Sequence, residues 1–298
     1  MALARMGTFL LWAAVLAGSA LGRERTPIGD GEAALAGAVQ GLAEFLPISS
    51  SAHLLLLREL TRGGETPTAD RKEALWHFDL LLQLASACAV FAAYPRRTGQ
   101  LCRGIAGRSR EGLRLLGLLL LAFLPAALAG ALLDLLRWHP SPGLRALGWP
   151  LLLGGAYLLA FEHIFRQRGR RELAELDGRD ALFIGAAQTL ALFPGVSRSL
   201  MSLTAALARG LCPSAAVEFT FFLGGGTIGA AAGHRFFAGG LSTLATFSGK
   251  SVAIGCGCAF LCAIPSLFIL NHLLRNCTLR PFAYYRILLG LAILAIYC

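Results

Sequence analysis

Long apolar stretches dominate this chain of 298 residues and restrict it to a membrane-embedded fold. The residues are 56% hydrophobic and only 15% charged, whereas a soluble domain carries about 25% charged residues. Several stretches approach or exceed the roughly 20 residues that a helix needs to cross a bilayer. We therefore predict an all-α, polytopic integral membrane protein. The apolar segments are 33–57, 75–94, 113–136, 149–165, 181–207, 215–232, 251–274 and 282–297.

The N-terminal residues 1–30 stand apart from this core. Arg5 precedes an apolar run and then a series of small residues, which resembles a signal peptide. An extra membrane segment that is retained is the alternative. We expect residues 31–298 to form a single membrane domain.

The positive charge of the chain, a net +10, comes almost entirely from arginine. Arginines crowd the loops that follow the second and the fourth apolar segments, and the positive-inside rule places both loops in the cytoplasm. Membrane lipids are expected partners of such a surface. Basic runs interleaved with aromatic residues are lacking, which argues against nucleic acid.

Two of the apolar segments, 33–57 and 181–207, are interrupted by polar and helix-breaking residues. Such groups are tolerated at membrane depth only where they face protein or a watery cavity. We expect each segment to form a broken, re-entrant helical hairpin that returns to its starting side. The interrupting residues are Gln40, Glu44, Pro47, Ser49, Ser50, Ser51 and His53 in the first segment, and Gln188, Pro194, Gly195, Ser197, Arg198 and Ser199 in the second.

These two segments also resemble each other at an offset of 148 residues. Chance similarity between two Ala- and Leu-rich stretches is the alternative, but the offset is close to half the chain and favours a duplication. With about six transmembrane helices, the loop charges then predict an inverted-topology repeat, about 31–165 and 180–298, whose polar sites meet near the midplane. The aligned pairs include Gln40 with Gln188, Phe45 with Phe193, Ser49 with Ser197, and Ser51 with Ser199.

The first polar segment carries groups suited to a phosphorylated ligand. Gln40 and Glu44 are four residues apart and share a helix face. A carboxylate in lipid needs a partner, and a divalent cation that bridges Glu44 to phosphate oxygens would supply one. The serines after Pro47 offer hydroxyls at a helix start, where backbone N–H groups bind anions. His53 is suited to proton transfer near neutral pH.

The second polar segment carries Arg198, whose planar fork of donors matches phosphate. Together the two segments suit phosphoryl transfer, in which positioning and charge stabilisation supply most of the catalysis. Three alternatives remain open from the residues alone. Glu44 can serve as a proton or ion relay, Arg198 can simply pair with Glu44, and the serines can join helices.

At these motifs the chain resembles the undecaprenyl-pyrophosphate phosphatase family of the bacitracin-resistance type. The family carries Glu/Gln-x-x-x-Glu before Pro-x-Ser-Ser-x-x-His, and Pro-Gly-x-Ser-Arg-Ser-x-x-Thr further on. The resemblance spans roughly residues 33–298, including Phe78–Leu84 and Pro281–Arg286. The matched motif residues are Gln40, Glu44, Pro47, Ser49, Ser50 and His53, then Pro194, Gly195, Ser197, Arg198 and Ser199.

The resemblance implies a hydrolase in the bacterial cytoplasmic (inner) membrane that removes the terminal phosphate of the C55 lipid diphosphate. This reaction recycles carrier lipid for peptidoglycan synthesis and confers bacitracin resistance. By position, it implies catalytic roles for His53, Ser50, Glu44 and Arg198, with Ser50 or His53 as nucleophile. A divalent cation, Mg²⁺ or Ca²⁺, is implied at Glu44 and Gln40 through the diphosphate. The implied substrate-binding residues are Gln40, Ser49, Ser51, Ser197, Ser199 and Ser202.

The chain departs from the family pattern at several positions. Gln40 stands where many relatives have Glu, which removes one charge from the metal site. Ala52 and Ser202 replace the usual Gly and Thr, and Gly224–Gly226 replace an Ala-x-Pro-like stretch. A membrane transporter or flippase for a phosphorylated lipid or an ion is the alternative function, because inverted repeats also serve alternating access. The oligomeric state is left open, with a homodimer as one arrangement.

Overall fold

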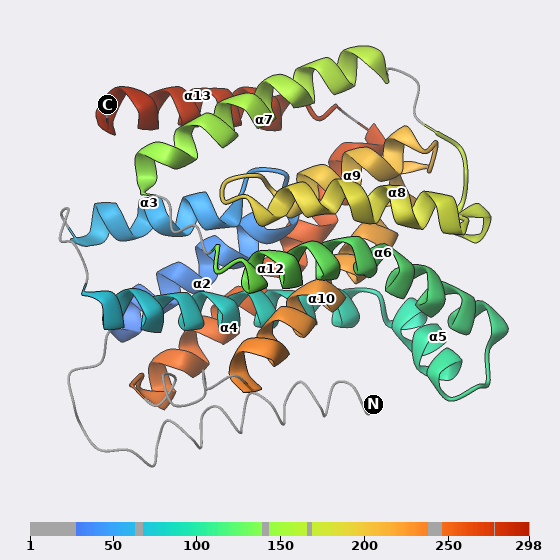
Figure 1. Cartoon of the computed structure of the whole chain (residues 1–298), viewed down its shortest axis with the longest axis horizontal. Coiled ribbons are helices and arrows are strands. Elements are labelled where there is room, and N and C mark those ends of the chain that lie inside the picture. The colour runs from blue at the N-terminus through green and yellow to red at the C-terminus, as the bar shows by residue number, and fades with distance from the viewer. Residues whose placement is uncertain are drawn as a thin grey trace.

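The computed structural model describes residues 28–62, 68–138, 143–165, 169–237, 246–276 and 278–297, and within them it is a bundle of α-helices (Figure 1). Residues 1–27 of the predicted N-terminal segment 1–30 lie outside the described residues. The helices are α2 (Asp30–Phe45), α3 (Ser50–Arg62), α4 (Ala69–Ala93), α5 (Pro95–Ile105), α6 (Arg110–Leu135), α7 (Leu144–Ile164), α8 (Gly178–Thr189), α9 (Arg198–Ala208), α10 (Pro213–Arg235), α12 (Gly249–Asn276) and α13 (Arg280–Tyr297).

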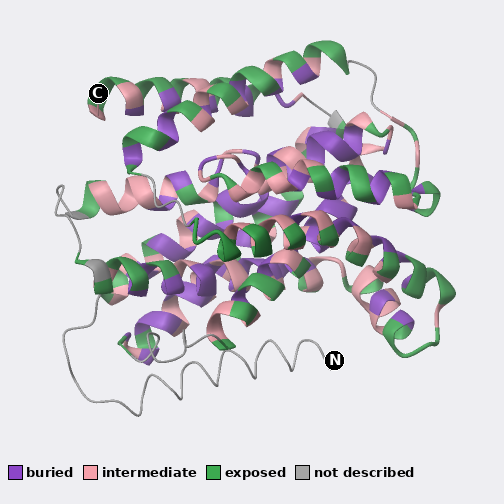
Figure 2. Ribbon diagram, viewed as in Figure 1, coloured by how far each residue is buried: buried purple, intermediate pink, exposed green. Residues whose placement is uncertain are grey.

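Six of the described helices are long and apolar enough to cross a membrane: α4, α6, α7, α10, α12 and α13. The prediction of about six transmembrane helices in an all-α membrane protein is therefore confirmed. Exposed apolar side chains are the rule on the outer helices, where Leu120 and Leu128 of α6 are 55% and 68% exposed. Figure 2 shows exposed residues along the outer sides of α6, α7 and α13 and buried residues between the inner helices. The lipid-facing surface is thus apolar, as a bilayer requires.

The two polar segments each form a pair of helices with a turn between them, α2–α3 and α8–α9. The first turn contains Pro47, and the second contains Pro194 and Gly195, so neither chain segment can continue as one helix. Both predicted hairpins are therefore present.

The helix pairing has the same form in the two halves of the chain. The first hairpin helix of one half packs along the second long helix of the other half, α2 on α12 and α8 on α6. Two further pairs, α4 with α10 and α7 with α13, join corresponding helices of the two halves. Figure 1 shows α7 and α13 side by side at one edge of the bundle. This is the pairing expected of two interlocked repeats related by a two-fold axis.

Glycines permit the close approach of the interlocked helices. A side chain at Gly37 of α2 would collide with the carbonyl oxygen of Gly255 in α12, and one at Gly185 of α8 would collide with that of Ala122 in α6. Gly37 and Gly185 are separated by the same 148-residue offset as the polar motifs. Small residues drive helix association in membranes because they allow backbones to touch.

One element differs from the prediction. The Arg-rich stretch after α4 is not only a loop but also forms α5, which begins at Pro95 and carries Arg96, Arg97 and Arg103. Its apolar positions, among them Leu101 and Ile105, lie between basic ones, so the helix is amphipathic. At 11 residues it is too short to cross the bilayer, and a search for long apolar runs therefore misses it.

The glycine contacts between the interlocked helices can be tested by adding one methyl group. We expect Gly37→Ala to destabilise the protein by about 1–3 kcal/mol, because the new Cβ meets backbone that cannot move aside. The control is Gly117→Ala in α6, where a Cβ would meet nothing within 4 Å. Thermal unfolding in detergent should show a lower Tm for the first variant only. An unchanged Tm for Gly37→Ala would contradict the close approach.

Candidate active site

The turns of the two hairpins meet inside the bundle and place two helix starts together. α3 begins at Ser50 and α9 begins at Arg198, which are equivalent positions in the repeat. Ser199 Oγ of the second turn donates to the carbonyl oxygen of Leu46 in the first, at 2.9 Å. Both turns contain a left-handed residue, with φ of 74° at Ser49 and 87° at Gly195. The predicted site residues of both segments therefore lie at one place.

Glu44 is the buried acid of this site and has three partners. Gln40 Nε2 donates to Glu44 Oε2 at 2.5 Å, and Ser50 Oγ donates to the same oxygen at 2.9 Å. Arg198 lies within ion-pair distance, 3.7 Å from its terminal nitrogen to Glu44 Oε1. The carboxylate thus sits between an amide, a hydroxyl and a cation, all within reach of one ligand.

Arg198 has a firmer contact with a residue that the sequence motifs did not include. Its terminal nitrogen donates to Gln83 Oε1 of α4 at 3.1 Å. A guanidinium has five N–H donors, so the contacts with Gln83 and Glu44 leave donors for a ligand. The Arg198 side chain is about a quarter exposed, at 26%. This arrangement orients a cation and keeps it accessible.

The His53 ring is held between a carbonyl oxygen and a tyrosine. Its Nδ1 lies 2.7 Å from the Ser49 carbonyl oxygen, which can only accept, so in the neutral ring Nδ1 carries the proton. Nε2 then has the free electron pair and accepts from the Tyr285 hydroxyl at 2.6 Å. The two rings also stack, with centroids 5.6 Å apart. His53 therefore presents a basic nitrogen that Tyr285 covers.

The remaining serines divide into two kinds. Ser49 and Ser51 are hydrogen-bonded to each other at 3.3 Å, and the equivalent Ser197 and Ser199 at 2.9 Å. Ser197 also caps α9 by accepting from the Leu200 N–H. Ser202 donates to the Arg198 carbonyl oxygen at 2.9 Å, within its own helix. Their predicted role in substrate binding stays a prediction, while their observed role is to shape the two turns.

Arg286 of α13 also belongs to this site, although the motifs did not assign it a role. Its guanidinium is fully buried and donates to the carbonyl oxygens of Pro47 and Gly195, one in each hairpin turn, at 3.2 and 3.3 Å. A third bond, 2.9 Å long, reaches the carbonyl oxygen of Pro150 in α7. The neighbours Tyr285 and Arg286 thus hold His53 and the two turns from the far end of the chain.

The oxygen atoms around Glu44 suit a hard divalent cation. Gln40 Oε1 is buried and has no hydrogen-bond partner, and the Glu44 carboxylate lies beside it. No group of three or more His, Cys, Asp or Glu side chains gathers for a metal within the described residues. A cation here therefore needs phosphate oxygens from a substrate, which is the usual arrangement for Mg²⁺.

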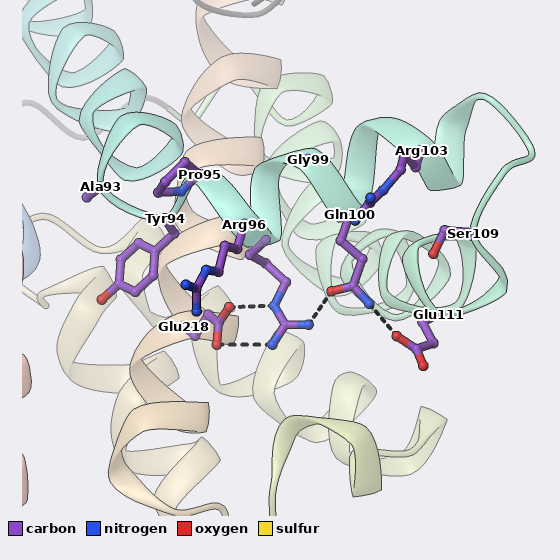
Figure 3. Close-up of a pocket in the computed structure, with 11 residues that line it drawn as sticks. Ala93, Tyr94, Pro95, Arg96, Gly99, Gln100, Arg103, Ser109, Glu111 and Glu218 are labelled. Carbon is purple, nitrogen blue, oxygen red and sulfur yellow. Dashed lines mark hydrogen bonds and ion pairs between the residues drawn. The ribbon is translucent and has the colours of Figure 1, made fainter.

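A cavity of about 1090 Å³ lies elsewhere among the described residues (Figure 3). It surrounds Tyr94, eleven residues beyond Gln83, or roughly 16 Å further along at 1.5 Å per helical residue. There Arg97 Nε donates to Glu218 at 2.5 Å, and Gln100 bridges Arg97 to Glu111. Glu218 is thus neutralised by an ion pair, and no histidine lines this cavity.

A buried acid, an arginine and an imidazole, gathered where two hairpins meet in a helical membrane protein, define a membrane-embedded site for a phosphorylated ligand. The chain matches the family described as bacitracin resistance protein BacA over residues 33–292 and belongs to that family. An undecaprenyl-diphosphatase of Sorangium cellulosum (strain So ce56) is 33% identical, over 88% of this chain and 85% of that protein. Another, of Pseudomonas aeruginosa PAO1, is 35% identical, over 89% and 92% respectively.

The hydrogen bonds of His53 predict a single neutral tautomer that NMR can detect. At pH 8, ¹⁵N spectra of histidine-labelled protein should show His53 as a neutral ring protonated at Nδ1. Tyr285→Phe keeps the ring stack and removes the donor, so the Nε2 resonance should shift. Tyr284→Phe, at the exposed neighbouring tyrosine, should leave it unchanged. Protonation of His53 at Nε2 would contradict the assignment.

Proposed function

We propose that this chain is an undecaprenyl-diphosphate phosphatase, which hydrolyses the C55 lipid diphosphate to the monophosphate and phosphate. The observation that carries the proposal is the joining of Glu44, Ser50 and Arg198 across two hairpin turns. The relatives that share its family are undecaprenyl-diphosphatases. We place the protein in the bacterial cytoplasmic membrane, where it would recycle carrier lipid for peptidoglycan synthesis and confer bacitracin resistance.

Arg198 and the helix starts bind the diphosphate in this proposal. The guanidinium matches phosphate oxygens through two parallel N–H donors. The N-termini of α3 and α9 add backbone N–H groups and the positive ends of two helix dipoles. A divalent cation, Mg²⁺ or Ca²⁺, would be held by Glu44 and Gln40 together with the diphosphate and would neutralise charge on the phosphate oxygens. All of these side chains belong to the same polypeptide chain, so the proposed site does not require a second subunit.

Ser50 is the nucleophile that the geometry favours. Its hydroxyl donates to the buried Glu44 carboxylate at 2.9 Å, which orients the oxygen and draws its proton away. The Ser50 oxygen would attack the terminal phosphorus as the bond to the bridging oxygen breaks and releases the lipid monophosphate. Water would then hydrolyse the phosphoserine and release inorganic phosphate.

His53 serves the proton transfers in this scheme. It lies three residues after Ser50 on the same face of α3, so both can face one phosphoryl group. No hydrogen bond joins His53 to Ser50 among the described residues, where Nε2 bonds to Tyr285 instead. His53 would accept a proton from the attacking water in the second step, once the Tyr285 hydroxyl moves off Nε2. Tyr285 is then a positioning residue.

Phosphate release tests the function directly. Purified protein should release phosphate from C55 diphosphate. EDTA should abolish this activity, and added Mg²⁺ or Ca²⁺ should restore it. Arg198→Lys keeps the charge but loses the two-donor fork, so we expect kcat to fall by about a hundredfold or more. Arg209→Lys, outside the site, is the matched control. Movement of lipid across vesicle membranes without phosphate release would favour the transporter alternative. Full activity in the presence of EDTA would contradict the proposed requirement for a divalent cation.

The identity of the nucleophile can be tested by trapping the phosphorylated enzyme. Acid quenching during turnover of substrate labelled with ³²P in the terminal phosphate should leave an acid-stable label on Ser50, because phosphoserine survives acid and phosphohistidine does not. Ser50→Ala should abolish the label. His53→Ala should slow phosphate release by about 10²–10⁴-fold, the usual contribution of a general base, while labelling persists. An acid-labile label on His53 would overturn the assignment.

A further inference from the structure

An apolar groove lies between α7 and α9, beside the second hairpin turn. It encloses about 320 Å³ and has no charged side chain in its lining. Trp149 and Leu153 form its outer rim and are 58% and 63% exposed. Tyr157 closes one end, because its hydroxyl donates to Thr204 Oγ1 of α9 at 2.9 Å. The groove therefore opens toward lipid and offers no partner for a polar headgroup.

The wall of this groove on α9 is continuous with the candidate active site. Val196, Leu200 and Met201 line it, and they flank Ser197 and Arg198 in the sequence. Met201 lies three residues after Arg198, so the two side chains are neighbours on the surface of α9. The groove therefore begins within one helical turn of Arg198 along α9.

The floor of the groove is formed by Gly154 and Pro150 of α7, which meet the buried arginine of the site. A side chain at Gly154 would collide with the Arg286 guanidinium, and the Pro150 carbonyl oxygen accepts a hydrogen bond from it at 2.9 Å. Only these few atoms separate the groove from the group that holds both hairpin turns. The groove thus lies directly against the residues that support the polar site.

We propose that this groove binds the first isoprene units of the substrate's prenyl chain while the diphosphate lies at Arg198. The inference rests on the proposed function, since it assigns the apolar part of the same substrate. A long prenyl chain attached to a buried diphosphate must leave the site through an apolar opening to the bilayer. The α7–α9 groove combines access from lipid with a wall on the helix that carries Arg198. Because the chain moves from lipid and not from water, close packing in the groove, and not the hydrophobic effect, would favour its binding there.

The groove has room for only part of a long chain. Its lining on α7 extends from Trp149 to Tyr157, about 12 Å at 1.5 Å per residue. The remaining isoprene units would lie in the membrane. Chain-length selection by this groove is therefore expected between very short and longer prenyl diphosphates, and to level off once the groove is filled.

Filling the groove tests the proposal through a comparison of two substrates. Met201→Trp should lower kcat/KM for C55 diphosphate by about tenfold or more, within the range of apolar pocket discrimination, and change it little for inorganic diphosphate, which has no prenyl chain. Leu128→Trp on α6 adds a side chain of the same size at another lipid-facing position and should leave kcat/KM unchanged for both substrates. An equal loss on both substrates in Met201→Trp, or no loss on C55 diphosphate, would overturn the groove assignment.

A second measurement does not depend on turnover. A prenyl monophosphate that carries a benzophenone within its first isoprene units should, on illumination, label residues 149–157 or 196–201, as read by mass spectrometry. C55 monophosphate, but not a phospholipid in equal excess, should compete with the label. Labelling spread over α6 and the other lipid-facing helices, or equal competition by phospholipid, would contradict the groove. Failure of the wild type to release phosphate from C55 diphosphate would instead contradict the proposed function.

Discussion

The rest of the site depends on the hydrogen bonds that the Arg286 guanidinium donates to the two hairpin turns. Carbonyl oxygens at the turns of a broken helix have no helical partner, and lipid offers no water to replace it. Arg286 supplies donors to Pro47 and Gly195 in the two turns and to Pro150 of α7. Each of the two turn oxygens, those of Pro47 and Gly195, would cost roughly 1–3 kcal/mol if it were left unsatisfied in the interior. One side chain therefore allows two hairpins to end within hydrogen-bonding distance of each other.

The same residue sets the charge of the site. The charges of Glu44 and Arg198 offset each other at 3.7 Å. Within the described residues Arg286 bonds only to neutral carbonyl oxygens, so its positive charge is not cancelled by a neighbouring acid. Positive potential in a low-dielectric interior attracts an anion strongly. The group that stabilises the turns thus also favours a diphosphate between them.

The interlocked repeat explains why the two hairpins are alike in backbone and unlike in chemistry. Each turn contains a left-handed residue, at a different position in the two repeats, and both keep a pair of hydrogen-bonded serines at equivalent positions. At the first position of the second helix, however, one repeat places Ser50 and the other Arg198. Because the two turns meet, the hydroxyl and the guanidinium complement each other in one site. An unmodified duplicate would have placed two identical groups there.

Much of this arrangement could be predicted from the sequence, because it depends on local patterns. The six long helices follow from apolar runs, and the two hairpins follow from polar residues next to proline. The family resemblance implies roles for Glu44, Ser50 and Arg198, and the likeness of the two segments predicts that their polar groups meet. Their meeting is an outcome of the inverted repeat.

The residues that the sequence did not assign act across long separations. Tyr285 reaches His53 and Arg286 reaches Pro47 from the last helix, more than 200 residues away. In a single sequence, a Tyr-Tyr-Arg run near a membrane segment is typical of an interfacial anchor. Gln83 lies within an apolar helix with no partner in its own neighbourhood. Only the packing of α4 and α13 against the hairpins gives these residues their contacts.

The division of the site into a polar turn and an apolar groove follows from where the substrate is dissolved. A lipid diphosphate is stable in the bilayer only with its phosphates at the surface and its chain in the hydrocarbon. The hairpin turns reproduce that surface inside the protein, because they supply a guanidinium, hydroxyls and helix N-termini. The groove between α7 and α9 keeps the chain in an apolar environment at the same time. Both ends of the lipid can therefore be solvated during the reaction, and the chain does not need to leave the membrane.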